Sequence, residues 1–140
     1  MRVYLDSSAA LKRAIAESES ADLIVTLDKH HTDGDVLVAS SLAWVEVARA
    51  LRSLHSATLA EVADDVDAAL SGVAEHPLVA EVVALARRVS PAVLRSLDAI
   101  HLASALLLDA DVMLTYDQRL ATACLEGGLA VAAPGARRDR

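Results

Sequence analysis

Short apolar runs constrain the fold more than any other feature of this chain. Each run is three or four residues long and carries no charged residue, which is typical of strands that are buried on both faces. The runs are residues 3–5, 36–39, 112–115 and 129–131. Longer segments with helical periodicity separate them. Buried strands that alternate with helices predict an α/β protein with a parallel sheet covered on both faces.

The segments between the strands are expected to be helices. The pattern predicts them over residues 7–16, 18–30, 41–54, 58–70, 78–89, 97–108 and 117–125. Ser96 stands where a helix cap is expected, and Thr58 with Glu61 forms a capping box. Because no repeat or long linker divides the 140 residues, we expect one domain over residues 1–136 and a basic tail, 137–140, that frays.

Composition and charge exclude several classes of protein. A hydrophobic content of 54% excludes a disordered chain, and the absence of Phe predicts an aliphatic core. The only cysteine, Cys124, lacks the partners of a disulfide or a zinc site and is expected to be an ordinary thiol. No apolar run approaches the ~18 residues of a membrane span, and no signal pattern opens the chain, so we expect a soluble, cytoplasmic protein. The net charge of −7 is unusual for a nucleic-acid binder unless cations neutralise clustered acids.

Two acids stand at the ends of predicted strands. Asp6 follows the first strand directly, and Asp117 follows the third after only Tyr116. Open parallel sheets bind ligands beyond the carboxyl ends of their strands, so the two acids are candidates for one site. Asp is also a good N-cap, and a helix is expected after each of them. Both roles stay open, and one side chain can have both.

Asp98 lies in the first turn of a helix that is apolar nearly all round. Such a helix is expected to be buried, and a buried carboxylate is costly unless a cation or a hydrogen-bond donor meets it. The alternative is that Asp98 only complements the helix dipole. His101, one turn further along, is expected to be a satisfied core histidine rather than a neighbour of the site.

Glu46 receives no support from helical periodicity. The apolar stripe of its helix consists of Trp44, Val47, Ala48, Leu51 and Leu54. Glu46 lies on the opposite side, near Arg49, which is the pattern of a solvent-exposed ion pair.

Four fragments, in their order and spacing, resemble the PIN-domain family, in particular its VapC-type toxin ribonucleases. The fragments are residues 3–11, 44–47, 97–105 and 114–120. The resemblance implies a three-layer α/β/α PIN-like domain with a short, mainly parallel central sheet. It also implies an acidic pocket at one end of that sheet, made of Asp6, Glu46, Asp98 and Asp117. Ser7, Ser8 and Thr115 would supply supporting hydroxyl groups.

The resemblance further implies a metal-dependent endoribonuclease, the toxin of a toxin–antitoxin pair, with a cognate antitoxin and a homodimeric state. Carboxylate oxygens suit Mg²⁺ or Mn²⁺, and a metal-activated water would hydrolyse an RNA phosphodiester. Cationic side chains close in sequence to the acids are candidates for contacts to RNA phosphates. They are Lys12, Arg13, Arg49, Arg95 and Arg119.

Other classes of protein remain open from the residues alone. A haloacid-dehalogenase-like phosphatase also has an Asp after its first strand, but expects a second Asp where this chain has Ser8. A non-enzymatic α/β binding module with an inert acidic pocket would show no metal dependence and no loss on changing Asp98. In a purely structural domain, every acid would be a cap or a surface charge.

Overall fold

A computed structural model describes residues 1–137 of the chain. Within this range five strands form one parallel sheet in the order β3-β2-β1-β4-β5. The strands are β1 (Arg2–Leu5), β2 (Val36–Ser40), β3 (Val73–His76), β4 (Val112–Leu114) and β5 (Ala130–Ala132). The helices are α1 (Ser7–Ala14), α2 (Ser20–Thr32), α3 (Ser41–His55), α4 (Leu59–Ala69), α5 (Ala80–Ala86), α6 (Ser96–Leu107) and α7 (Gln118–Glu126).

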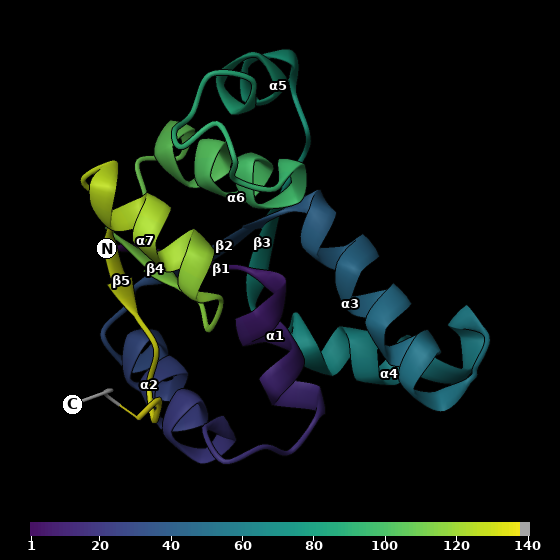
Figure 1. The fold of residues 1–140 in the computed structure, drawn as a ribbon. Coiled ribbons are helices and arrows are strands. Elements are labelled where there is room, and N and C mark those ends of the chain that lie inside the picture. The colour runs from purple at the N-terminus through teal and green to yellow at the C-terminus, as the bar shows by residue number, and fades with distance from the viewer. Residues whose placement is uncertain (138–140) are drawn as a thin grey trace.

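Helices cover both faces of the sheet (Figure 1). α1 to α4 make the connections from β1 to β2 and from β2 to β3, whereas α5 to α7 make the later connections on the opposite face. The chain adds β2 and β3 on one side of β1 and then β4 and β5 on its other side. Because each crossover between parallel strands is right-handed, this reversal places the later helices on the opposite face of the sheet. The predicted three-layer α/β/α domain with a parallel sheet is confirmed.

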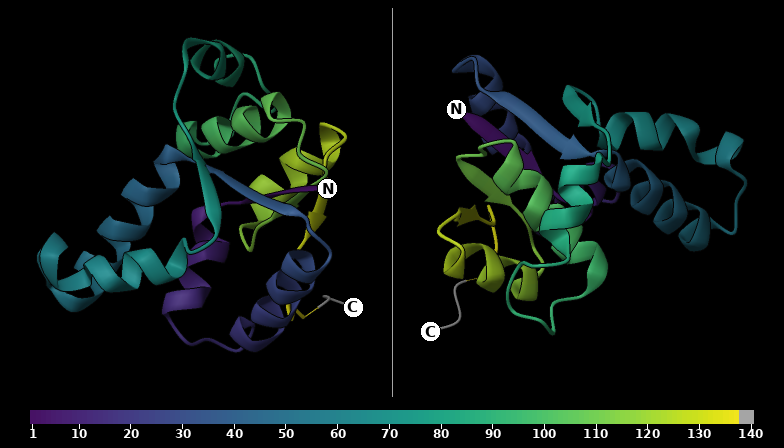
Figure 2. Two further views of the ribbon diagram at one scale, coloured as in Figure 1. Left: turned by 180° about the vertical axis from the view of Figure 1, so that it is seen from behind. Right: turned by 90° about the horizontal axis from the view of Figure 1, so that it is seen from above.

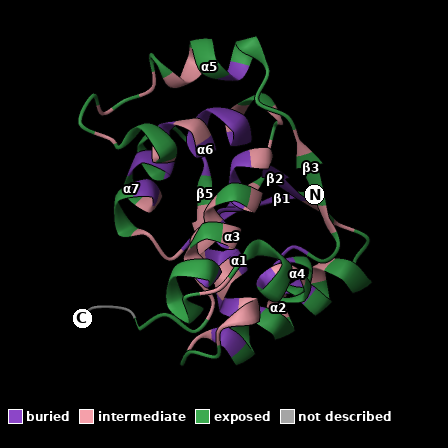
Figure 3. Cartoon of the chain, turned by 90° about the vertical axis from the view of Figure 1, so that its right-hand side faces the viewer, coloured by how far each residue is buried: buried purple, intermediate pink, exposed green. Residues whose placement is uncertain are grey.

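The central strand β1 sends alternate side chains into two cores, as a pleated strand must. Val3 and Leu5 pack with Leu23 of α2 on one face. Tyr4 packs with Leu102 of α6 on the other face. Figure 3 shows the buried positions gathered on the sides of α6 and α7 that face the sheet. The aliphatic core expected from the composition therefore has two halves, with β1 between them.

The strands β1 and β4 are neighbours whose following helices lie on opposite faces. The chain leaves β1 toward α1 on one face and leaves β4 toward α7 on the other. Open α/β sheets bind their ligands beyond the carboxyl ends of neighbouring strands whose connections diverge in this way.

The helices α3 and α4 pack against each other and project from the sheet as a pair (Figure 2). Ser56, in the left-handed conformation with φ of 48°, ends α3 and turns the chain back. The predicted capping box begins α4: the Thr58 hydroxyl accepts the N–H of Glu61, and the Glu61 carboxylate accepts the N–H of Thr58. Apolar residues of both helices, including Val47 and Val62, fill the space between them.

Most predicted helices are correct to within about two residues at each end, and three further differences concern α5, the cap of α6 and the exposure of α3. The helix expected over 78–89 is the shorter α5, because Val79 is its N-cap and the chain after Ala86 continues as a turn. Ser96 is the first residue of α6 and not its cap: Arg95 occupies the cap position without a capping side chain. Leu54, expected in the apolar stripe of α3, is 59% exposed because it lies near the outer end of the projecting pair.

The strand β3 does not follow from the apolar pattern. It lies at the edge of the sheet, pairs only with β2, and has no buried residue. An edge strand with exposed Ala74 and Glu75 lacks the continuous apolar run by which the other strands were predicted.

Two further expectations concern membrane-spanning helices and the basic tail at the C-terminus. Within residues 1–137, no helix is both long and apolar enough to cross a membrane. Most of the expected basic tail, residues 138–140, lies outside the described residues. The domain boundary at residue 136 therefore stays a prediction.

Candidate active site

Asp6 lies directly beyond β1 and is almost completely buried, with 3% of its surface exposed. Its Oδ1 accepts hydrogen bonds from the Ser8 hydroxyl at 2.7 Å and from the backbone N–H of Ala9 at 3.0 Å. Its Oδ2 accepts a bond of 2.6 Å from the Thr115 hydroxyl. Burial raises the pKa of Asp6, while these three hydrogen bonds act in the opposite direction. Asp6 is thus the N-cap of α1 and a fixed carboxylate at the end of β1.

Asp117 has the corresponding position beyond β4. Its Oδ1 accepts the backbone N–H groups of Arg119 at 2.9 Å and Leu120 at 3.1 Å, so Asp117 is the N-cap of α7. The backbone N–H of Asp117 donates to the Thr115 hydroxyl oxygen at 3.1 Å. Thr115 therefore touches both acids, which confirms that the two strand ends meet at one place.

Asp98 faces the same place from the first turn of α6. It is half-buried, and no hydrogen bond within residues 1–137 is donated to its carboxylate. Burial raises the pKa of Asp98, and the negative charge of Asp117 raises it further. Asp6 and Glu46 add to this effect, whereas His101 opposes it. The other three carboxylates therefore lie within electrostatic reach of Asp98, and the four are here named the acidic cluster.

Glu46 is not the exposed partner of Arg49 that helical periodicity indicated. Its side chain is 22% exposed, and its Oε1 lies 2.5 Å from Nε2 of His101 on α6. His101 is buried as expected, but it is also a direct neighbour of the cluster. Periodicity failed here because α3 meets α6 through one polar contact, and a count of apolar positions cannot detect such a contact.

The hydroxyl groups proposed near the acids have different surroundings. Ser8 Oγ donates to Asp6, accepts the backbone N–H of Tyr116 at 2.9 Å, and lies 3.4 Å from the Thr115 hydroxyl. Ser8 and Thr115 therefore bind the strand ends together. Ser7 is the first residue of α1, and no hydrogen bond of its side chain occurs among residues 1–137.

A sequence model of the PIN domain matches residues 3–125 of the chain. The chain belongs to the PIN-domain family. It is 37% identical over 138 residues to "Ribonuclease VapC47" of Mycobacterium tuberculosis, a match that covers 97% of this chain and 99% of that protein. It is 40% identical over 134 residues to "Ribonuclease VapC46" of the same species, covering 94% of this chain and 97% of that protein.

A solved structure confirms the fold of this PIN domain. The crystal structure of VapBC2 from Rickettsia felis, bound to a DNA fragment from its promoter, contains a chain that matches with a TM-score of 0.74. The match covers 94% of this chain and 98% of that chain, although only 12% of the residues are identical. Similar folds at such low identity reflect shared architecture rather than shared detail.

The donor groups of the acidic cluster fit a hard divalent cation. All four side chains offer oxygen atoms. Burial raises the pKa of Asp98, and the neighbouring carboxylates raise it further by a repulsion that a cation would relieve. In the described part of the PIN domain, no three side chains of the His, Cys, Asp and Glu types converge tightly enough to enclose a metal ion.

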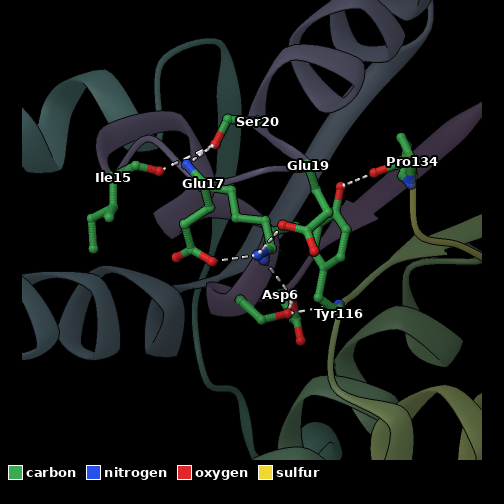
Figure 4. A network of polar contacts seen from close by, with 10 residues as sticks. Asp6, Ile15, Glu17, Glu19, Ser20, Tyr116 and Pro134 are labelled. Carbon is green, nitrogen blue, oxygen red and sulfur yellow. Dashed lines mark hydrogen bonds and ion pairs between the residues drawn. The ribbon is translucent and has the colours of Figure 1, made fainter. Parts of the chain in front are cut away.

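Two of the candidate phosphate contacts have partners inside the PIN domain. The ammonium group of Lys12 pairs with Glu17 at 2.8 Å and Glu19 at 3.0 Å, and lies 4.7 Å from the centre of the Tyr116 ring (Figure 4). Tyr116 in turn donates its hydroxyl to the carbonyl of Pro134 at 2.7 Å. This network ties α1 to the segment between β4 and α7. Lys12 therefore acts within the fold, beside the acidic cluster.

Arg13 also makes internal contacts. Its Nη1 donates to the carbonyl oxygens of Ala69 at 3.0 Å and Ser71 at 2.8 Å, which joins α1 to the end of α4. The other three candidates, Arg49, Arg95 and Arg119, are exposed. Arg95 precedes α6, and Arg119 is in the first turn of α7, so both stand next to acids of the cluster.

Sequence reasoning missed Tyr4 as a polar neighbour of the site. Its hydroxyl accepts the backbone N–H of Ser40 at 3.1 Å and lies 2.8 Å from Nδ1 of His101. The available signal was small: a tyrosine inside an otherwise aliphatic strand needs a partner for its hydroxyl. The identity of that partner depends on how β1 and α6 pack, which their separate patterns do not contain.

Proposed function

We propose that this PIN domain is a divalent-cation-dependent endoribonuclease that acts as the toxin of a toxin–antitoxin pair. The observation that carries the proposal is the position of Asp98, whose carboxylate lies within electrostatic reach of Asp6, Glu46 and Asp117 beyond the adjacent ends of β1 and β4. Two relatives that match nearly the whole chain are named ribonucleases, which supports the same reaction here.

Asp6, Glu46, Asp98 and Asp117 would hold Mg²⁺ or Mn²⁺. When bound, the cation supplies an activated water and neutralises negative charge on the phosphate under attack. Asp98 is the acid best placed to respond to a cation, because its carboxylate is half-buried and repelled by its neighbours. Thr115 and Ser8 hold Asp6 in one orientation through hydrogen bonds to both of its oxygens.

RNA is the proposed substrate, and an acidic protein needs cations to approach it. The net charge of −7 repels phosphates, so the bound metal and a few exposed arginines would have to provide the attraction. Arg95 immediately precedes α6, which carries Asp98, Arg119 follows Asp117 by two residues, and Arg49 is exposed one helical turn from Glu46 on α3. A ribonuclease that acts on cellular RNA works where that RNA is, and we therefore propose a cytoplasmic location.

A cognate antitoxin and a homodimer complete the proposal. The VapBC2 structure with the same fold supports an antitoxin partner, because its name joins a VapC chain to a VapB chain. A protein partner would neutralise the ribonuclease by occluding the acidic cluster or the approach to it.

The proposal is tested with the purified protein, free of antitoxin, and total cellular RNA. Cleavage is measured with Mg²⁺, with Mn²⁺ and with chelator, for wild type, for Asp98→Asn and for Asp67→Asn. Asp98 is preferred to Asp6 as the test site because it receives no hydrogen bond within residues 1–137, so its replacement removes none that the fold uses. Asp67→Asn is the matched control, since it makes the same chemical change on the exposed side of α4.

Discrete fragments that require the metal and disappear only in Asp98→Asn are the expected result. A folded wild type that cleaves RNA with neither metal, or an Asp98→Asn variant that cleaves as well as wild type, would refute the proposed active site. An inert binding module would then be the better description of the chain.

A further inference from the structure

A chain of three polar side chains links the sheet to the acidic cluster. The Tyr4 hydroxyl lies 2.8 Å from Nδ1 of His101, and Nε2 of the same ring lies 2.5 Å from Oε1 of Glu46. Tyr4 belongs to β1, His101 to α6 and Glu46 to α3. These three side chains therefore connect the central strand, the helix that carries Asp98, and the first helix of the projecting pair.

Burial decides what His101 is able to touch. Tyr4 and His101 are 0% and 1% exposed, whereas the Glu46 side chain is 22% exposed. The two rings meet edge to face, with centroids 5.8 Å apart and planes at 75°. His101 cannot contact RNA or solvent, so any influence it has on the acidic cluster passes through a neighbouring side chain.

The hydrogen bonds also indicate which nitrogen of His101 carries the ring proton. The Tyr4 oxygen already accepts the N–H of Ser40 at 3.1 Å, and burial raises the pKa of its phenol, so its proton is retained and available to Nδ1. Nε2 then carries the ring proton and donates it to the Glu46 carboxylate. Each group in the chain is satisfied in this arrangement, and no other arrangement of a neutral ring gives an ionised Glu46 a donor.

We propose that His101 is a positioning residue that fixes one oxygen of Glu46 and leaves the other directed at the cation site, with Tyr4 holding the ring in place. The inference rests on the proposed function, because it assigns Glu46 to cation binding. A glutamate has several flexible torsions, and a rigid donor removes most of that freedom before the cation arrives. Asp98 and His101 are one turn apart on α6, so the same helix sets the spacing between two acids of the cluster.

The alternative role for His101 is a purely structural one, in which it only satisfies Tyr4 in the core. The two roles differ in what happens when Glu46 is changed as well. A positioning residue acts through Glu46 and has no further effect once Glu46 is neutral. A structural residue has the same effect whether Glu46 is present or not.

The test measures Mn²⁺ binding by calorimetry, without RNA, for wild type and four variants. His101→Leu removes the donor, His101→Gln keeps an N–H near the position of Nε2, and Glu46→Gln neutralises the carboxylate. The double variant His101→Leu/Glu46→Gln completes a double-mutant cycle. Leu102→Val is the added control for packing, because Leu102 lies beside His101 on α6 and contacts the same core. Urea unfolding of each variant confirms that the binding experiments use folded protein.

His101→Leu is expected to weaken Mn²⁺ binding about 10–100-fold, as is typical when a metal-binding side chain is deprived of its hydrogen-bond partner. His101→Gln should recover most of that affinity, Leu102→Val should bind as wild type does, and the double variant should bind no more weakly than Glu46→Gln alone. If His101→Leu does not fold, His101→Asn, whose shorter side chain does not reach Glu46, takes its place in the cycle, alone and combined with Glu46→Gln.

Two outcomes would overturn the inference and are distinguishable from each other. A wild type that binds Mn²⁺ normally, with His101→Leu equal to it or equally impaired in both Glu46 backgrounds, refutes the positioning role alone. A wild type that neither binds Mn²⁺ nor cleaves RNA refutes the proposed function, and the positioning role with it.

Discussion

Thr115 donates a hydrogen bond of 2.6 Å from its hydroxyl to Oδ2 of Asp6, across 109 positions of the chain. Its oxygen also accepts the backbone N–H of Asp117 at 3.1 Å. Because Thr115 is 1% exposed, water cannot replace it in either bond. One buried hydroxyl thus sets the geometry of two acids that come from opposite ends of the sequence.

Replacement of Thr115 should therefore affect both stability and cation binding. Thr115→Val deprives Asp6 of a donor and the Asp117 N–H of an acceptor, at an expected cost of about 1–3 kcal/mol in the free energy of unfolding. Thr115→Ser keeps the hydroxyl and serves as the matched control. Urea unfolding and Mn²⁺ calorimetry measure the two effects, and equal behaviour of the Val and Ser variants would contradict the role of the hydroxyl.

The metal-free protein should gain stability when Asp98 loses its charge. The folded-state pKa of Asp98 is raised above the ordinary value of 3.8, so its stabilising contribution is full below that value and is lost as the pH rises through the folded pKa. In chelator, Asp98→Asn should then be more stable than wild type at neutral pH, and the difference should vanish in acid. Urea midpoints over a pH series measure this.

The order of stability should reverse when Mn²⁺ is added. A cation that binds only the folded state stabilises wild type more than Asp98→Asn. Asp67→Asn, on the exposed side of α4, should follow wild type under both conditions. A difference in stability between wild type and Asp98→Asn that is the same with and without the metal would count against cation binding at Asp98.

Asp117 has two separable roles, and two substitutions distinguish them. Its Oδ1 caps α7 by accepting two backbone N–H groups. Asn caps as well as Asp does, so Asp117→Asn should keep the free energy of unfolding, whereas Asp117→Ala should lower it by about 1 kcal/mol. Both variants should bind Mn²⁺ more weakly, because both lack the charge. Full Mn²⁺ affinity in Asp117→Asn would show that Asp117 is only a cap.

The exposed arginines should contribute to RNA binding in proportion to the phosphates they contact. Arg95→Ala or Arg119→Ala should weaken RNA binding in chelator and reduce the salt slope of log K by about 0.7 for each phosphate that the arginine neutralises in wild type. Arg13→Ala tests a different position, because its guanidinium binds the carbonyls of Ala69 and Ser71. It should lower the urea midpoint and leave the salt slope unchanged. A reduced slope in Arg13→Ala would instead support the phosphate contact considered from the sequence.

The parts of the fold that were predicted are those encoded locally. β1 and β4 are continuous apolar runs, and Asp6, Asp117 and Thr58 are capping residues whose roles depend only on the next few positions. The parts that were missed depend on packing between distant elements. β3 lacks a continuous apolar run, and it is a strand because its backbone pairs with the otherwise free edge of β2.

The candidate site divides in the same way. Parallel strands bring their carboxyl ends to the same edge of a sheet, so Asp6 and Asp117 were candidates for one site from the sequence alone. Glu46 instead depends on a contact across 55 positions with a histidine that its own helix cannot specify. Its helical pattern indicated solvent, and only the family resemblance placed it among the acids.

Asp6 and Asp117 each hold the first turn of a helix as well as an edge of the acidic cluster. Neither carboxylate is able to swing aside without releasing the backbone groups that it caps. An inactive conformation in which these carboxylates turn away would therefore cost free energy, because the first turns of α1 and α7 would lose their caps. We therefore expect restraint of this protein to come from outside, by something that covers the carboxylates and leaves their geometry intact.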